Sequence, residues 1–221
     1  MKTWALILVV LILEACGTKS ELSIEGASIE LCACFNSQTT GTIDDRLSPC
    51  LQQIVNNKND EWQSSGIINQ DTIKYKLSMF TLHIMIDMTR TCENYFAAVN
   101  ELYDKGYPTD TTELNKKVIK ELSTRIETEV SMDSVKSLLH KKVYRLIQAK
   151  EFDMALQSID SIKSLDDTDY DANLASAYIF NQKGLHDKAV IEITRAIELS
   201  GNENLKLYAE IAKKKKLISK N

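Results

Sequence analysis

A self-similarity with a period of 34 residues constrains this 221-residue chain more than any other feature of its sequence. Ala155 recurs as Ala189, and the same shift carries Tyr144 to Tyr178. A repeat of this length with helical periodicity predicts pairs of helices, each packed on the next. The scarcity of Gly (7) and Pro (2) favours helices with short connections over a sheet. We therefore predict an all-α fold.

The second copy of this repeat resembles the turn and second helix of a tetratricopeptide repeat. The resemblance rests on the segment from Gly184 to Val190 and on the segment from Ala196 to Leu199. The first copy is degenerate, with Lys150 where the family carries a turn glycine. The resemblance covers residues 136–202, and a closing helix is expected from Glu203 to Leu217. It implies two tetratricopeptide-like hairpins that bind a protein segment.

The same resemblance implies a groove lined by the first helix of each pair. The groove positions recur at intervals of four and three residues, so they form one stripe. They are His140, Tyr144, Ile147, Leu174, Tyr178 and Asn181. Two tyrosines on neighbouring repeats would give the amphipathic surface that is enriched at binding hot spots. The alternative is that the N-terminal part of the chain covers this stripe.

The N-terminus reads MKTWALILVVLILEACG, with Lys2 before an apolar run from Trp4 to Leu13. Ten helical residues cover about 15 Å, roughly half of a bilayer's hydrocarbon core, so the run suits a signal peptide rather than a span. The sequence from Leu13 to Cys16 resembles the lipobox of bacterial lipoproteins. That resemblance implies removal of residues 1–15 and a diacylated Cys16. An ordinary secretory signal with a chance cysteine is the alternative.

Lipidation at Cys16 would make residues 16–21 a short tether to a membrane, because two or more acyl chains hold a protein stably. Gly17 is not the Asp that retains lipoproteins in the inner membrane of enteric bacteria. We therefore expect a protein of the bacterial envelope, anchored in the outer membrane and facing the periplasm.

Four further cysteines, Cys32, Cys34, Cys50 and Cys92, form an even set that predicts two disulfides in an oxidising compartment. Residues two apart on a helix point about 200° from each other, so Cys32 and Cys34 should not pair together. We favour Cys34–Cys50 and Cys32–Cys92, although the spacing alone does not distinguish this from the opposite pairing. The stretch 22–108 then forms one stapled helical unit.

A redox site at Cys32 and Cys34 and a metal site are the alternatives to structural disulfides. The Cys-x-Cys pair lies in the middle of an expected helix rather than at its N-terminus, and His83 has no His companion at ligand spacing. The arrangement resembles a Cys-x-Cys helical domain of Bacteroidota lipoproteins. Neither a metal nor a cofactor is predicted.

Apolar periodicity predicts the remaining helices. In the cysteine unit they span Glu25 to Phe35, Pro49 to about Asn57 after a Ser48-Pro49 start signal, and one long helix from Asn69 to Asp104. The methionines of the long helix are expected in its core. Residues 109–133 would form a linking segment with an amphipathic helix from Thr112 to Val130, and residues 134–221 would hold the two repeats and the capping helix.

The charged residues give no sign of a nucleic-acid partner or of catalysis. The net charge is −4, and no nucleophile, phosphate or metal motif is present. Asp166, Asp167 and Asp169 lie in the expected turn between the repeats, where acidic residues are expected to cap the next helix. The run Lys213 to Lys216 is expected to be a solvated helix end rather than a site for anionic lipid.

Together these patterns predict a membrane-anchored envelope lipoprotein that is not an enzyme and that binds an unknown envelope protein through its repeat groove. The alternatives are a thiol-active lipoprotein that uses Cys32 and Cys34, and a structural accessory without a discrete ligand.

Overall fold

A computed structural model describes residues 23–66 and 69–220, and every regular element among them is a helix. The predicted all-α class is therefore confirmed. The signal peptide, the lipobox and Cys16 lie outside the described residues. Within the described part, no helix combines the length and the apolar content needed to cross a bilayer.

Four helices form the N-terminal unit: α2 (Ile24–Ser37), α3 (Ile43–Ser64), α4 (Gln70–Thr91) and α5 (Glu93–Asp104). Their inward faces share one apolar core in which Leu31, Ile84 and Met88 have no exposed surface. Cys32 is bonded to Cys92 and Cys34 to Cys50, with Cα–Cα distances of 5.8 and 5.9 Å. The disulfides therefore join α2 to the start of α5 and to α3, in the pairing that the sequence analysis favoured.

The start of α3 differs from the prediction. The helix begins at Ile43 and contains Pro49, because a capping box at Thr42 and Asp45 starts it six residues (49 − 43) before the predicted start. Thr42 Oγ1 accepts from the backbone N–H of Asp45, and Asp45 Oδ2 accepts from the backbone N–H of Thr42 at 2.9 Å. A cap with two satisfied donors outweighs the preference of proline for the first turn.

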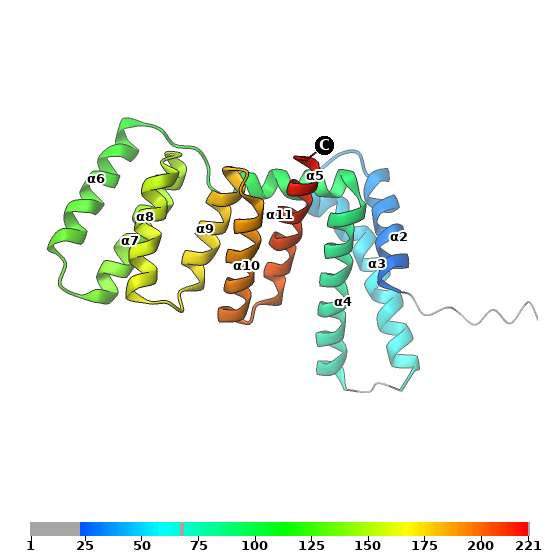
Figure 1. Cartoon of the computed structure of the whole chain (residues 1–221). Coiled ribbons are helices and arrows are strands. Elements are labelled where there is room, and N and C mark those ends of the chain that lie inside the picture. The colour runs from blue at the N-terminus through cyan, green and yellow to red at the C-terminus, as the bar shows by residue number, and fades with distance from the viewer. Residues whose placement is uncertain (1–22, 67–68, 221) are drawn as a thin grey trace, which may run out of the picture.

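The helix predicted from Asn69 to Asp104 is two helices. Cys92 has extended backbone angles (φ −105°, ψ 100°), which ends α4 and begins α5. The chain changes direction at this point (Figure 1). The apolar periodicity continues across the break because Cys92 is itself buried, so the sequence pattern does not reveal it.

The C-terminal helices stand side by side in one row (Figure 1). They are α6 (Glu113–Thr128), α7 (Met132–Gln148), α8 (Phe152–Leu165), α9 (Tyr170–Gln182), α10 (His186–Ser200) and α11 (Lys206–Ile218), with a 3-10 turn at Glu203–Leu205 before α11. α7 packs on α8, and α9 packs on α10. Ala155 and Ala189 are fully buried, so the paired helices approach closely at both.

The two ends of this row are covered by different parts of the chain. α6 packs on α7 at one end, whereas α4 and α5 pack on α11 at the other. α5 therefore reaches from α11 to α9, and the linker after it continues from α9 past α7 to α6 (Figure 1). This path determines what occupies the predicted groove.

Candidate functional site

The predicted groove residues divide into an accessible and a covered set. Tyr144 is 42% exposed and His140 is half-buried. Ile147, Tyr178 and Asn181 are buried, and Leu174 is partly buried. The prediction of an open stripe is therefore wrong at Ile147, Tyr178 and Asn181. The alternative that the N-terminal part covers the stripe holds at Tyr178 and Asn181, which bond to Asp104 and Tyr103.

The covering residues are two tyrosines at the end of α5 and in the linker after it. The Tyr103 ring lies 5.6 Å from that of Tyr178 and 5.5 Å from that of Tyr208 on α11. The Tyr107 ring lies 4.5 Å from Tyr178 and 5.5 Å from Tyr144. An aromatic row therefore runs from α11 across α9 to α7, with the linker inserted into it.

Hydrogen bonds fix this segment at the α9 end of the groove. Tyr178 Oη donates to the backbone oxygen of Asp104 at 3.0 Å, and Asn181 Nδ2 donates to Tyr103 Oη at 3.0 Å. Gln182 Nε2 donates to Asp104 Oδ1 at 2.8 Å. Burial raises the pKa of Tyr103, and it raises that of Tyr178 to about 12. Both phenols therefore remain neutral donors at ordinary pH.

The same segment is held at the α7 end. The backbone N–H of Asp110 donates to the carbonyl oxygen of Gln148 at 2.9 Å. Asn115 Nδ2 donates to the carbonyl oxygen of Arg145 at 3.2 Å. The first bond satisfies the Gln148 carbonyl at the end of α7, and the second adds to the bond that the Arg145 carbonyl already accepts from the Ala149 backbone N–H. The chain between Tyr103 and Asp110 is therefore held to α9 at one end and to α7 at the other.

The sequence analysis did not identify Tyr103, Asp104 and Tyr107 as groove residues. The available signal was local: two tyrosines flank Gly106 beside Pro108, which is an unusual density of aromatic residues for a linker. Their contacts with Tyr178 and Asn181 reach over 74 and 78 residues, so no helical pattern contains them.

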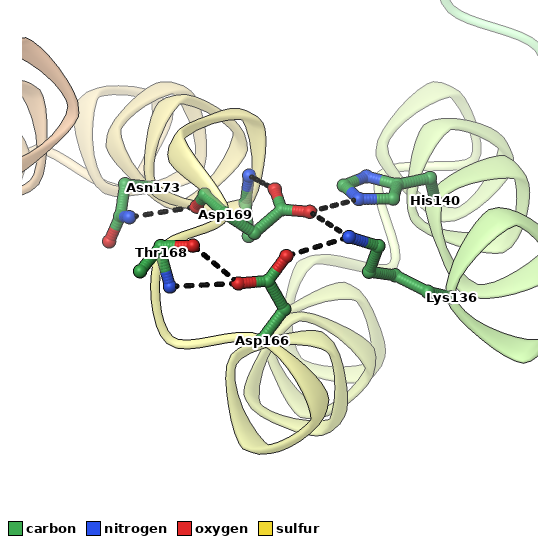
Figure 2. A network of polar contacts seen from close by, with 7 residues as sticks. Lys136, His140, Asp166, Thr168, Asp169 and Asn173 are labelled. Carbon is green, nitrogen blue, oxygen red and sulfur yellow. Dashed lines mark hydrogen bonds and ion pairs between the residues drawn. The ribbon is translucent and has the colours of Figure 1, made fainter. Parts of the chain in front are cut away.

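Next to the accessible part of the groove lies a polar network that joins the two repeats (Figure 2). Asp169 caps α9 by accepting the backbone N–H of Ala172, and its other oxygen lies 2.9 Å from His140 Nε2 on α7. Lys136 Nζ donates to Asp166 Oδ2 at 2.7 Å. The predicted capping role is confirmed for Asp169.

Asp166 connects the end of α8 to α7 through Lys136 and is poorly suited to act as a catalytic acid. The hydrogen bond from Lys136, together with two bonds from Thr168, lowers the pKa of Asp166 to about 2. A carboxyl group so readily ionised is a poor general acid or base near neutral pH. The network therefore ties α7 to the end of α8 and to the start of α9, and it holds the His140 ring.

The lysine run of α11 is not the solvated end that the sequence predicted. Each lysine pairs with an acidic group: Lys213 with Glu210, Lys214 with Glu93, Lys215 with Asp104, and Lys216 with Asp187. Lys214 and Lys215 have side chains only 12% and 18% exposed. They join α11 to α5, because the N-terminal unit packs against this end of the row.

A second ion pair at the same junction joins α4 to α11. Arg90 Nε donates to Glu210 Oε2 at 2.7 Å, and the Glu210 side chain is only 8% exposed. Burial would raise the pKa of Glu210, but hydrogen bonds from Arg90 and Lys213 outweigh it and hold the pKa below its usual value.

Within residues 23–66 and 69–220, histidine, cysteine and acidic side chains form no group of three or more suited to a metal ion.

The comparisons with known proteins give no family to which this chain can be assigned. No family model, curated protein or solved structure matches it significantly. Its function is therefore inferred from its own residues.

Proposed function

We propose that this chain is a lipid-anchored protein of the bacterial envelope whose helical body is a non-catalytic protein-interaction module. The anchor would be the lipid on Cys16, held in the outer membrane with the body facing the periplasm. Residues 16–21 would connect that lipid to α2, which begins at Ile24. The body that follows is held in shape by two disulfides and by the ion pairs around α11.

The observation that carries the proposal is the exposure of Tyr144 beside a filled groove. Tyr144 projects from the first helix of the first hairpin and contacts the half-buried Tyr107 and the Gln148 amide. His140 lies one turn earlier and is held by Asp169. These three side chains, His140, Tyr144 and Tyr107, form what we call the open groove end. A rigid aromatic surface with polar groups at its edge is typical of protein-binding sites.

The contacts that already fill part of the groove also limit which partner segments can bind there. A partner segment cannot enter between α9 and the linker, because Tyr178 and Asn181 are already bonded there. The partner segment can instead pack against Tyr107 and Tyr144, at the accessible end of the aromatic row. The interface predicted here is therefore smaller than the full repeat groove, which suggests a transient partner rather than a permanent subunit.

Site-specific photo-crosslinking in cells tests this proposal. A photoreactive phenylalanine derivative at position 144 should give a discrete protein adduct, and the same group at Ile191 should not. Ile191 is 66% exposed on α10 and lies away from the groove residues, so it controls for accessibility. Equal adducts at both positions, or none at either, would contradict the binding role of the open groove end.

The anchor requires a separate test. Cys16→Ser should abolish acyl labelling and leave the protein unprocessed or released from the membrane. A variant that stays with the membrane fraction after its signal peptide has been removed would contradict lipid attachment at Cys16. This result would leave the crosslinking result at position 144 unaffected.

A further inference from the structure

A hollow of about 500 Å³ lies where the end of α4, the start of α5 and the C-terminal half of α11 meet (Figure 1). Charged side chains from all three helices line it: Arg90, Glu93, Glu210, Lys213 and Lys214. Leu217 and Ile218 complete its edge and are 63% and 51% exposed. The hollow therefore places cations beside accessible aliphatic side chains, which suits an anion that carries an apolar part.

The cations of the hollow keep unused donors although they are paired. Glu210 is only 8% exposed, and its two oxygens accept from Arg90 Nε at 2.7 Å and from Lys213 Nζ at 2.6 Å. Neither terminal amino group of Arg90 has a hydrogen-bond partner within residues 23–66 and 69–220, and the side chains of Arg90 and Lys213 are 54% and 53% exposed. Three cations and two carboxylates leave the described lining with a net charge of +1. An oxyanion can therefore reach a guanidinium and an ammonium group at once.

Glu93 is the carboxylate of this lining that an approaching anion would meet. Its side chain is 73% exposed, and its Oε1 accepts from Lys214 Nζ. Lys214 is only 12% exposed and also donates to the carbonyl oxygen of Arg90 at 2.7 Å. Glu93 therefore opposes an anion in the hollow, whereas Arg90 and Lys213 attract it.

The hollow lies within reach of the membrane in which the proposed anchor inserts. Cys32 is eight residues, about 12 Å, along α2 from Ile24. Its Cα lies 5.8 Å from that of Cys92, which stands between the α4 and α5 residues of the hollow. Residues 16–23 span at most about 28 Å when fully extended. The tether is therefore long enough for the hollow to face the surface that holds the lipid.

We propose that this hollow binds the phosphate of an anionic membrane lipid and gives the anchored body a second contact with its membrane. The phosphate oxygens accept from the terminal amino groups of Arg90 and from the ammonium group of Lys213, in the forked geometry that arginine offers to phosphate. The glycerol and the first acyl carbons pack on Leu217 and Ile218. The net positive charge favours an anionic lipid over a zwitterionic one. The proposal rests on the proposed lipid anchor and not on the open groove end.

Photo-crosslinking in vesicles tests the lipid contact. The full lipidated chain, with a photoreactive phenylalanine derivative at Leu217, would be reconstituted into vesicles of phosphatidylcholine with and without phosphatidylglycerol. We expect a lipid adduct whose yield is about fivefold higher with phosphatidylglycerol. The same group at Ile191, which is 66% exposed on α10, should show no such difference. Equal yields at Leu217 in the two kinds of vesicle, or no lipid adduct there, would overturn the proposal.

Two substitutions of opposite sign locate the contact. Lys213→Gln should lower the adduct yield about fivefold in phosphatidylglycerol vesicles, and it leaves the bond from Arg90 to Glu210 in place to hold the fold. Glu93→Gln should raise the yield, because it removes the exposed negative charge. Lys206→Gln is the matched control, since Lys206 lies on the same helix, is 44% exposed and also pairs with a glutamate three residues before it. A yield that Lys213→Gln leaves unchanged, that Glu93→Gln lowers, or that the control lowers equally would overturn the assignment.

Two further measurements separate a lipid phosphate from a free one and the hollow from the anchor. Inorganic phosphate, added at constant ionic strength, should leave the adduct yield unchanged. A yield that falls as phosphate rises would show that the hollow takes a free anion instead of a lipid. Acyl labelling of the same sample reports on the anchor: labelled protein without an adduct at Leu217 refutes the hollow alone, and unlabelled protein refutes the anchor and with it the proposal.

Discussion

Removal of the two disulfides one at a time should destabilise the protein by different amounts. In the double variant Cys32→Ala/Cys92→Ala a loop of 60 residues is released, and in Cys34→Ala/Cys50→Ala a loop of 16. The loop-closure entropy of the unfolded chain gives about 4 kcal/mol for the longer loop and about 3 kcal/mol for the shorter. We therefore expect the first variant to be less stable by about 1 kcal/mol.

The comparison is well matched because each variant removes one buried and one half-buried sulfur. Cys92 is 1% exposed and Cys50 is 3% exposed, so the loss of packing should be similar in both. Urea unfolding followed by circular dichroism would give the two free energies from the midpoint and the slope. Equal stabilities, or the opposite order, would refute the reasoning from loop length. Quantitative alkylation of the four thiols in the native, unreduced protein would refute the disulfides and favour a redox or metal role.

Two further predictions follow from backbone conformation and burial. Lys150 has a φ of 61° at the position equivalent to Gly184, where φ is 72°, so Lys150→Gly should raise the free energy of unfolding by about 0.5–1 kcal/mol. Gly184→Ala should lower the free energy of unfolding by a similar amount, since only the backbone angle opposes the new methyl group. Thermal unfolding in which the two substitutions change the stability in the same direction would contradict this account. Because burial raises the pKa of Tyr178 from 10.0 to about 12, the stability that depends on its neutral form is complete below pH 10 and is lost between about pH 10 and 12. Tyrosinate absorbance and circular dichroism during an alkaline titration would measure this loss, and Tyr178→Phe should reduce it.

The features that the sequence predicted correctly are those encoded over short distances. Ala155 and Ala189 lie one 34-residue period apart, and both are fully buried, on α8 and on α10. The opposite directions of Cys32 and Cys34 on one helix excluded a bond between them. The break at Cys92 escaped prediction, because a single extended residue that is itself buried leaves the apolar periodicity intact.

The stripe on α7 and α9 could be identified from the sequence, but whether the N-terminal part covers it stayed an open alternative, and the reason lies in the topology of the chain. A self-similar pair of tyrosines identifies a stripe on α7 and α9, yet it carries no information about what lies on that stripe. The covering residues come from the end of α5, whose contacts with α9 span more than 70 residues of sequence. The same limit applies to the lysine run, where Lys215 pairs with Asp104 across 111 residues.

The filled groove is a consequence of where the two units are placed. The N-terminal unit packs on α11, the last helix of the row, and α6 packs on α7, the first. Since α6 follows the N-terminal unit directly in the chain, α5 and the linker together must cross from α11 to α6, and the tyrosine and amide side chains of the groove lie along that path. A partner that occupied the whole groove would have to displace the linker, which is a continuous part of the same chain. It would also have to break the hydrogen bonds of Tyr178 and Asn181. Binding is therefore expected at the open groove end rather than along the whole face that the repeat pattern alone would select.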